Sequence, residues 1–498
     1  MTTSKRNNRK SNILPKSPTG IQGLDEVTGG GLPKGRPTLV AGAAGCGKTL
    51  FAMEFLVRGA IQYDEPGVFL AFEENAEELA QNVASFGFDL KALARQKMLT
   101  VDYVRVERTE IEEAGEYNLD GLFIRLGHAI DTISAKRVAL DTIEVLFSAI
   151  PNQGILRAEL HRLFRWLKDK GVTAIVTGER GEGTITRFGL EEYVADCVIV
   201  LDHRVNEQLS TRRLRIVKYR GSLHGTNEYP FLIGRNGISV LPITSLALEH
   251  HASTERVSSG IKKLDEMLGN KGFYRGSSIL ISGTAGSGKT SLASTFVDAA
   301  CRRGERCLYF AFEESPSQII RNMASIGLDL QPHVKKGRLN FHATRPSLYG
   351  LEMHLVTIHD LIREMEPDIV VIDPITDFIS IGSELEVKST VTRLIDHLKT
   401  LEITTMLTSI TAEEHSVDQS LVGVSSLIDT WISVRNLEDS GERRRGIFIL
   451  KSRGMSHSSE IRPFLLTDNG IEIGTLDPAV SRAALQAPQK SKQKVHLY

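Results

Sequence analysis

The chain has 498 residues, enough for two or three folded cores, and its 60 Lys and Arg residues nearly balance 61 Asp and Glu residues. This balance argues against a protein whose whole surface binds polyanions. The four cysteines form no CxxC pair, which argues against a zinc module or a disulfide framework and favours a reducing compartment. Without a secretory signal pattern or an apolar run of membrane-spanning length, we expect a cytoplasmic protein that does not bind a membrane.

Both ends of the chain are polar and basic and lack apolar periodicity. Residues 1–16 and 475–498 are therefore expected to be disordered tails. Basic arms that contact nucleic acid are the alternative interpretation of the same composition.

A glycine-rich segment at residues 42–49, GAAGCGKT, fits the phosphate-binding pattern G-x-x-x-x-G-K-[ST]. An apolar run at 38–41 precedes it as an expected strand, and a helical pattern follows it. In such a loop the backbone N–H groups face a phosphate, the lysine reaches the outer phosphates and the threonine hydroxyl ligates Mg²⁺. The predicted nucleotide-binding residues are Gly42, Gly45, Gly47, Lys48 and Thr49, with Thr49 also a metal ligand.

The same pattern recurs at residues 283–290, GTAGSGKT, again between an expected strand and an expected helix. Two complete loops predict that the chain binds ATP and Mg²⁺ at two places. The second set of predicted nucleotide-binding residues is Gly283, Gly286, Gly288, Lys289 and Thr290, with Thr290 also a metal ligand.

The two loops belong to an internal repeat. Gly20 and Gly260 open the two halves at an offset of 240 (260 − 20), and the loop lysines are 241 apart (289 − 48). Landmarks in the same order at nearly constant offset indicate a tandem duplication. We therefore expect a first domain at 17–247 and a second at 248–474.

Each half alternates short apolar runs with helical stretches. In the first half these runs lie at 38–41, 68–72, 138–140 and 173–177. The alternation predicts a mainly parallel α/β sheet with helices on both faces. Closely spaced strands then follow at the end of each half, and we expect them to form an antiparallel addition; in the first half they are 198–201, 214–218 and 229–233.

Acidic residues follow several of the expected strands. Asp141 and Asp373 end apolar runs, where a carboxylate can hold Mg²⁺ beside a phosphate loop. The pairs Glu73-Glu74 and Glu313-Glu314 also follow strands directly, and a carboxylate there can deprotonate an attacking oxygen. The alternative is that these glutamates only stabilise the first turn of the following helix, where acidic residues are common. Because the pairs recur at matching positions, we predict that all four glutamates are catalytic, and we prefer the first of each pair as the acting residue.

Cations lie beyond the nucleotide-binding strands. They form two pairs, Lys218 with Arg220 and Lys451 with Arg453. If a pair lies on a strand, its two side chains point to the same face of the sheet. They form either a solvated face or, in a ring, groups that reach a neighbour's nucleotide as an arginine finger does. His224 and His457 follow them. A lone histidine without ligand spacing is by default structural, and both are included among the candidate nucleotide-binding residues.

These features resemble the KaiC family of circadian-clock ATPases and autokinases, from about residue 17 to 474. The resemblance is carried by the two phosphate loops, the Phe-Glu-Glu strand ends and the sequences GGLP at 30–33 and EEYV at 191–194. It implies two RecA-like domains and a homohexamer of two stacked rings with ATP at subunit interfaces. It further implies hydrolysis in the first ring and transfer of phosphate in the second ring to two adjacent hydroxyl residues, which match Ser425 and Ser426 here.

The chain departs from the family pattern at three places. The second acceptor position is Ser426 instead of threonine, and Pro374 follows Asp373 where a hydroxyl residue is expected. The segment after Gly474 does not resemble the one through which the clock protein binds its activator KaiA. We therefore expect a KaiB-like protein to bind the first ring and no KaiA-like activator to act.

Two other functions fit a duplicated phosphate loop. A DNA-directed RecA-like motor would need a basic loop after the fourth strand, but 181–189 and 411–423 are short and weakly basic or acidic, which argues against nucleic-acid binding. A nucleotide-gated scaffold would do little chemistry, and the intact lysines and glutamates of both halves argue against it.

Overall fold

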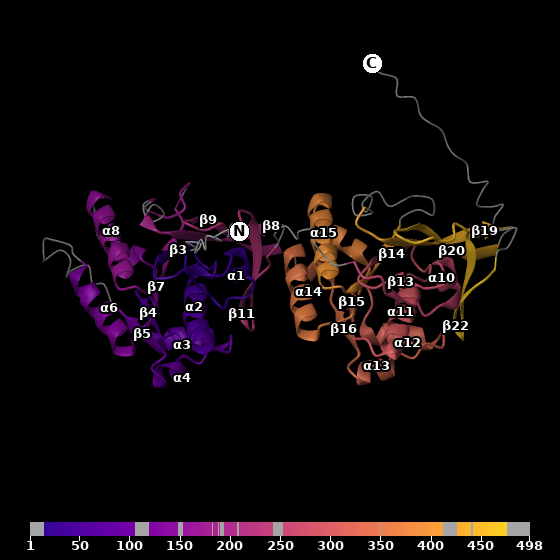
Figure 1. Cartoon of the computed structure of the whole chain (residues 1–498), viewed down its shortest axis with the longest axis horizontal. Coiled ribbons are helices and arrows are strands. Elements are labelled where there is room, and N and C mark those ends of the chain that lie inside the picture. Colours follow the sequence, from indigo (N-terminus) through magenta and orange to yellow (C-terminus); the bar gives the residue numbers. More distant parts are fainter. Residues whose placement is uncertain are drawn as a thin grey trace, which may run out of the picture. The chain divides into compact units, whose positions relative to one another are not determined.

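The chain divides into two compact units, Met1–Thr244 and Ser245–Tyr498. The structure, a computed structural model, describes residues 14–104, 119–147, 153–181, 183–187, 189, 194–206, 209–242, 252–348, 350–411, 426–439 and 442–475. Within these residues each unit contains one nine-stranded, mostly parallel sheet flanked by helices, with antiparallel strands at one end (Figure 1). The predicted fold class is confirmed. Both expected tails lie almost wholly outside the described residues.

The sheet of the first unit has the strand order β11-β10-β9-β8-β3-β7-β6-β4-β5. Its strands are β3 (Pro37–Gly42), β4 (Gly67–Ala71), β5 (Leu99–Tyr103), β6 (Arg137–Asp141), β7 (Thr173–Glu179), β8 (Cys197–Asn206), β9 (Leu209–Tyr219), β10 (Glu228–Gly234) and β11 (Gly237–Val240). The expected antiparallel part was wrong in one strand: β8, at 198–201, runs parallel to β3. The connection from β7 to β8 spans 180–196, long enough for the chain to cross back before it pairs.

Helices cover both faces of this sheet, because its buried strands alternate apolar side chains between the two faces. Val40 packs in the cluster formed with α2 (Lys48–Tyr63), whereas Leu39 packs in the other cluster, formed with α6 (Asp120–Ile133). The remaining elements are α3 (Ala76–Ala84), α4 (Leu90–Arg95), α8 (Gln153–Asp169), the short helices α1 (Leu24–Val27) and α7 (Glu144–Phe147), and the ribbon of β1 (Lys16–Ser17) with β2 (Leu32–Pro33).

The second unit repeats this arrangement, in the order β16-β15-β17-β18-β14-β19-β20-β21-β22. Its strands are β14 (Ser278–Gly283), β15 (Cys307–Ala311), β16 (Leu339–Ala343), β17 (Ile369–Asp373), β18 (Thr404–Ile410), β19 (Thr430–Asp439), β20 (Glu442–Ser452), β21 (Arg462–Thr467) and β22 (Gly470–Ile473). The flanking elements are α10 (Lys262–Met267), α11 (Lys289–Arg303), α12 (Pro316–Ala324), α13 (Gln331–Lys335), α14 (Leu351–Met365), α15 (Glu384–Thr400), the turns η1 (Pro346–Leu348) and η2 (Ile375–Ser380), and the ribbon of β12 (Arg256–Val257) with β13 (Phe273–Tyr274). Figure 1 shows α14 and α15 side by side, apart from α11 and α12.

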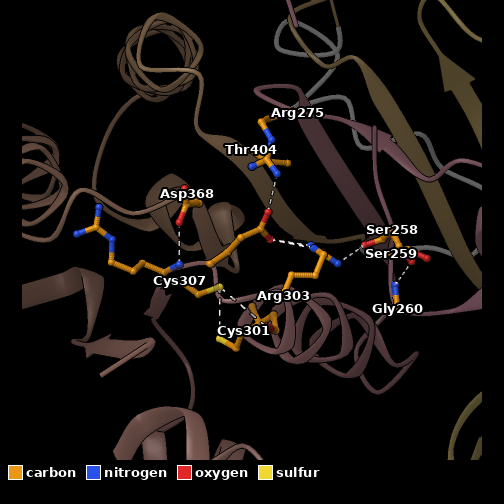
Figure 2. Close-up of polar contacts among 12 residues, drawn as sticks. Ser258, Ser259, Gly260, Arg275, Cys301, Arg303, Cys307, Asp368 and Thr404 are labelled. Atoms are coloured by element: carbon orange, nitrogen blue, oxygen red, sulfur yellow. Dashed lines mark hydrogen bonds and ion pairs between the residues drawn. The ribbon is translucent and has the colours of Figure 1, made fainter. Parts of the chain in front are cut away.

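The turn that joins α11 to β15 is held by charged side chains and two thiols (Figure 2). Glu305 accepts hydrogen bonds from Arg275, at 2.7 Å, and from Arg303, at 2.8 Å. The Sγ atoms of Cys301 and Cys307, both buried, lie 3.6 Å apart. These contacts fix where β15 begins, and β15 leads to the glutamate pair of the second unit.

Among the described residues, no helix is both long enough and apolar enough to cross a bilayer.

Candidate functional site

The phosphate loop of the first unit connects β3 to α2 at the carboxyl edge of the sheet. Gly47 has φ 102°, and a Cβ atom there would lie 2.9 Å from Cδ1 of Ile233, so a glycine is required. The Nζ atom of Lys48 donates to the carbonyl oxygens of Gly42, at 2.9 Å, and Ala43, at 3.0 Å. Because α2 begins at Lys48, its first N–H groups face the loop, where an anion is stabilised.

Asp141 lies at the same edge, where β6 ends. Its Oδ2 accepts a hydrogen bond from the Thr49 hydroxyl at 2.8 Å, and its Oδ1 accepts one from the Thr177 hydroxyl at 2.6 Å. Burial raises the pKa of this carboxyl, although both hydroxyls oppose that effect. A hydroxyl and a carboxylate oxygen this close are hard donors of the kind Mg²⁺ prefers, so the predicted metal ligands fit that ion.

The two glutamates of the first unit have different partners. Glu73 is exposed, and its Oε2 accepts a hydrogen bond from the Thr142 hydroxyl at 3.3 Å. Glu74 Oε2 accepts one from Asn82 Nδ2 at 3.1 Å. Glu73 thus contacts the residue that follows the predicted metal ligand Asp141, whereas Glu74 contacts a residue of α3.

A cavity of about 300 Å³ opens beside this loop. Its polar lining includes Lys48, Thr49, Glu74 and Asn82, and its apolar lining includes Ile233. Polar groups converging at one end of an apolar cleft are typical of a small-molecule site. The residues present therefore fit a nucleotide whose phosphates lie on the loop.

The second unit repeats the loop geometry but changes the partners of its aspartate. Lys289 Nζ donates to the carbonyl oxygens of Gly283 and Thr284, each at 2.8 Å, and burial lowers the pKa of this lysine. Asp373 accepts hydrogen bonds from the hydroxyls of Thr408 and Tyr309, the latter at 2.6 Å. No hydrogen bond joins Thr290 to Asp373 in the described part of the chain, in contrast to Thr49 and Asp141.

Glu313 also differs from its counterpart Glu73. Pro374 occupies the position of Thr142 and has no hydroxyl to donate, so the Thr142 bond has no equivalent here. Burial and then the neighbouring Asp373 raise the pKa of Glu313, and burial and then Glu313 raise that of Asp377 to about 6. Glu314 keeps the partner seen in the first unit, because Asn322 Nδ2 donates to its Oε2 at 3.1 Å.

The predicted cations of the first unit lie at the opposite edge of the sheet from the loop. Lys218 pairs with Val198 at the amino end of β8, whereas Leu201 of β8 pairs with Gly42 at the start of the loop. At about 3.3 Å per residue, roughly 10 Å of strand separates these positions. Lys218 lies on β9, whereas Arg220 does not share that strand, because β9 ends at Tyr219 and Arg220 begins a turn.

Asp196 anchors that turn. Its Oδ1 lies 3.9 Å from Nη1 of Arg220, and its carbonyl oxygen accepts the Arg220 N–H at 2.8 Å. The ring of His224 lies parallel to that of Tyr219, with centroids 6.4 Å apart, and its Nδ1 is 2.9 Å from the carbonyl oxygen of Gly225. The structure thus brings Lys218, Arg220 and His224 together, but away from the loop of their own unit.

The second unit places one predicted acceptor at the corresponding edge. Ser426 is exposed, and its carbonyl oxygen accepts a hydrogen bond from Arg453 Nη2 at 2.6 Å. Lys451 pairs with Trp431 near the start of β19, and Arg453 lies just past the end of β20. His457 follows, with Nδ1 3.5 Å from the carbonyl oxygen of Met455. Ser425 lies outside the described residues.

Five side chains at these sites were missed by the sequence analysis: Thr177, Thr408, Asn82, Asn322 and Tyr309. The first four are two identical pairs at matching positions of the repeat, 231 and 240 residues apart (408 − 177, 322 − 82). A residue-by-residue alignment of the two halves would therefore have pointed to these four residues. Tyr309 has no identical counterpart, because Phe69 occupies the matching position, so the alignment would have shown it only as a difference between the halves.

Comparison with known proteins agrees with this duplicated geometry. A family model described as "ATPase: KaiC" matches the chain twice, at 17–245 and 257–477. The chain belongs to the KaiC ATPase family. The family assignment predicted from the sequence is confirmed, and with it nucleotide binding and two tandem RecA-like domains.

Several curated relatives align over most of the chain. The "Circadian clock protein KaiC2" of Synechocystis sp. is 57% identical over 468 residues, covering 94% of this chain and 82% of the relative. The "Circadian clock oscillator protein KaiC" of Parathermosynechococcus lividus is 39% identical, covering 92% of this chain and 85% of its own length. The protein of the same name from Synechococcus elongatus is 37% identical, covering 95% and 91%.

Proposed function

We propose that the chain hydrolyses ATP with its first unit and, with its second, transfers phosphate to Ser425 and Ser426, as a timing or signalling protein. The observation that carries the proposal is the duplicated site at the carboxyl edge of each sheet. Each site joins a complete phosphate loop, a buried aspartate and an adjacent glutamate pair. Relatives named as circadian clock proteins support the timing role.

In the first site Lys48 and the N–H groups of its loop bind the phosphates of ATP. Thr49 and Asp141 would hold Mg²⁺, which would neutralise charge on the phosphates. Glu73 orients a water and accepts its proton as the water oxygen bonds to the γ-phosphorus and the bond to the β-phosphate oxygen breaks. Glu74, bonded to Asn82, positions the segment that carries Glu73.

We propose that each site is completed by a second copy of the chain, as in the homohexamer of two stacked rings that the family implies. Lys218 and Arg220 lie at the amino edge of their sheet and cannot reach the loop of their own unit. In a ring, this edge would face the carboxyl edge of a neighbour, so the cations would stabilise the charge that develops on the neighbour's phosphates. His224 would lie with them, and Lys451, Arg453 and His457 would act equivalently in the second unit.

The same geometry supports phosphate transfer between copies in the second unit. Ser426 precedes Thr430, which pairs with Ile279, whereas the loop begins at Gly283, beside Val434. Ser426 is therefore at the edge that would face a neighbour's ATP. Glu313 of the neighbour would take the serine proton while the serine oxygen bonds to the γ-phosphorus and ADP leaves.

The first unit offers no serine at the positions that match the acceptors. Glu192 and Tyr193 stand there in the sequence, although both lie outside the described residues. Water is then the nucleophile of the first site. Of the two stretches that a DNA-directed motor would use to contact DNA, 181–189 lies partly and 411–423 largely outside the described residues.

We also propose that a KaiB-like protein binds the first unit and that no KaiA-like activator acts on the chain. The first statement rests on the family resemblance, and the second rests on the divergent segment after Gly474. A cytoplasmic location rests on the cysteine usage of the sequence. A pull-down of the full chain with purified KaiB and KaiA proteins, with and without ATP, tests the partner assignment.

The ATPase assignment is tested by removing each loop lysine. Lys48→Ala and Lys289→Ala should each abolish nucleotide binding at one site, because the phosphate charge loses its cation, and so halve the ATP bound per chain. Bound nucleotide is counted after rapid gel filtration, with Lys170→Ala, an exposed lysine just past the end of α8, as the control. Full stoichiometry in either loop variant would refute the assignment of that unit.

A further inference from the structure

The residues that follow the proposed phosphate acceptors are bonded to the first residue of β14, Ser278. The Ser278 hydroxyl lies 3.0 Å from the carbonyl oxygen of Leu427 and 2.9 Å from Oδ2 of Asp429, so its one hydrogen can bond to either oxygen. The Ser278 N–H donates to Oδ2 of Asp429 at 2.9 Å, and the Asp429 N–H donates to the Ser278 carbonyl oxygen at 3.0 Å. The sheet thus holds the chain directly after Ser426.

Lys399, in the last turn of α15, holds the same two groups. Its Nζ atom donates to the Leu427 carbonyl oxygen at 2.9 Å and lies 2.7 Å from Oδ2 of Asp429. Because the Lys399 side chain is only 14% exposed, salt in the solvent screens this ion pair less than one at the open surface. The Leu427 carbonyl and the Asp429 carboxylate are therefore tied both to a strand and to a helix.

The first unit keeps the ion pair but not the serine. Asp196, at the position of Asp429, has its Oδ2 2.5 Å from Nζ of Lys168, which matches Lys399. The position of Ser278 is taken by Pro37, the first residue of β3, and proline has neither an N–H group nor a hydroxyl. The hydrogen bonds that Ser278 donates therefore have no possible equivalent in the unit that offers no serine at the acceptor positions.

The place of the acceptor matters for phosphate transfer between copies. The serine oxygen must lie in line with the γ-phosphate, and a misplacement of about 1 Å can lower the rate about 10²-fold. Ser426 is exposed, and its carbonyl oxygen accepts a hydrogen bond from Arg453 at 2.6 Å. The contacts of the next residue, Leu427, add a second restraint on how far Ser426 can move.

We propose that Ser278 and Lys399 are positioning residues for phosphate transfer, which fix the segment after Ser426 and so place the acceptor hydroxyls for the neighbour's ATP. This inference rests on the proposed phosphorylation of Ser425 and Ser426. Both residues act on the place of the acceptor and not on the nucleotide. Loss of either should therefore lower the maximal rate of transfer without changing how tightly ATP binds.

The full chain carrying Ser278→Ala tests this role, because alanine removes the hydroxyl and keeps the N–H group. Phosphate on Ser425 and Ser426 is followed over time by peptide mass spectrometry at a series of MgATP concentrations. We expect the maximal rate to fall about tenfold or more, and the ATP concentration that gives half this rate to stay the same. Lys399→Met should have the same effect, whereas a general loss of structure would also weaken ATP binding.

Ser277→Ala is the matched control. It removes the hydroxyl of the preceding residue, which donates to the Tyr274 carbonyl oxygen at 2.6 Å, and it should leave the rate unchanged. An unchanged maximal rate in Ser278→Ala or Lys399→Met, or a fall with an equal loss of ATP binding, would overturn the positioning role of that residue and leave the acceptor assignment intact. If the unsubstituted chain carries no phosphate on Ser425 or Ser426, the proposed kinase function fails, and the positioning role fails with it.

Discussion

At the scale of single residues, the two sites share their ligand types but differ in the groups around them. Asp141 and Asp373 are both buried strand-end carboxylates, yet one is bonded to the loop threonine and the other to a tyrosine. Glu73 accepts a hydrogen bond from Thr142, whereas Pro374 offers none to Glu313. The two halves thus keep the same types of predicted ligand, while the hydrogen-bond donors around these ligands differ.

Glu54 gives a prediction at this scale that does not depend on function. It is fully buried in α2, and its Oε2 accepts the Ile238 N–H at 2.7 Å. Burial raises its pKa to about 7, against the opposing effects of that N–H group and Arg58. Because the folded pKa lies above the usual value, the stability this group contributes is complete below about pH 4.5 and is lost as the pH rises through 7.

We therefore expect the free energy of unfolding of the first unit to fall by about 2 kcal/mol between pH 5 and pH 8, and Glu54→Gln to remove most of that fall. Trp166 fluorescence during urea unfolding reports this unit when Trp431→Phe silences the other tryptophan. If the free energy of unfolding of the Glu54→Gln variant falls with pH as steeply as that of the unchanged chain, Glu54 is not the cause of the fall.

At the scale of elements, a stacked histidine pair joins α14 to α15. The rings of His359 and His397 have centroids 4.5 Å apart and an interplanar angle of 25°. Burial and then the neighbouring His359 lower the pKa of His397 to about 4, and burial lowers that of His359. Both rings are thus held neutral, and the stability they contribute is present above about pH 6.5 and lost as the pH falls toward 4.

The second unit should accordingly lose about 2 kcal/mol of unfolding free energy between pH 7 and pH 5 through His397, a trend opposite to that of Glu54. His397→Phe keeps an aromatic ring that cannot be protonated, so it should reduce the loss. The measurement is urea unfolding followed by Trp431 in a Trp166→Phe chain. If the variant loses stability on acidification as steeply as the parent, the histidine pair is not the cause.

Most of the fold was predictable from the sequence because its strands are buried on both faces and therefore read as continuous apolar runs. The phosphate loops and strand-end acids were predictable because their spacing is fixed by backbone geometry. The direction of β8 was not, since the side-chain pattern of a strand is the same whether it pairs parallel or antiparallel. The partners of Asp373 and the turn at Arg220 depend on tertiary contacts that no local pattern encodes.

At the scale of the whole molecule, the phosphate loop and the proposed interface cations of the first unit lie at opposite edges of its sheet. The loop lies at the carboxyl edge, and Lys218 and Arg220 lie at the amino edge. A single copy cannot bring these groups together within one unit. The proposal thus requires an assembly of several copies for full activity.

Mixing two inactive variants tests that requirement. Arg220→Ala and Lys48→Ala should each lower the ATPase activity of the first unit at least about tenfold. An arginine finger contributes about 10³-fold or more to the rate of phosphate transfer, and the loop lysine binds the phosphates. Assemblies containing both variants should regain activity, because an intact loop can meet an intact arginine from its neighbour. Absence of recovery in assemblies verified by native mass spectrometry would mean that Arg220 acts within its own chain or only on the surface.

The most direct test of the different chemistry in the two units is to map phosphate on the chain after incubation with MgATP, by peptide mass spectrometry. We predict phosphate on Ser425 and Ser426, its loss in Ser425→Ala/Ser426→Ala, and a strong reduction in Glu313→Gln. Glu73→Gln, the matched change in the first unit, should leave the modification in place. Phosphate at other positions, an undiminished signal in Glu313→Gln, or no phosphate on a protein that hydrolyses ATP would contradict it.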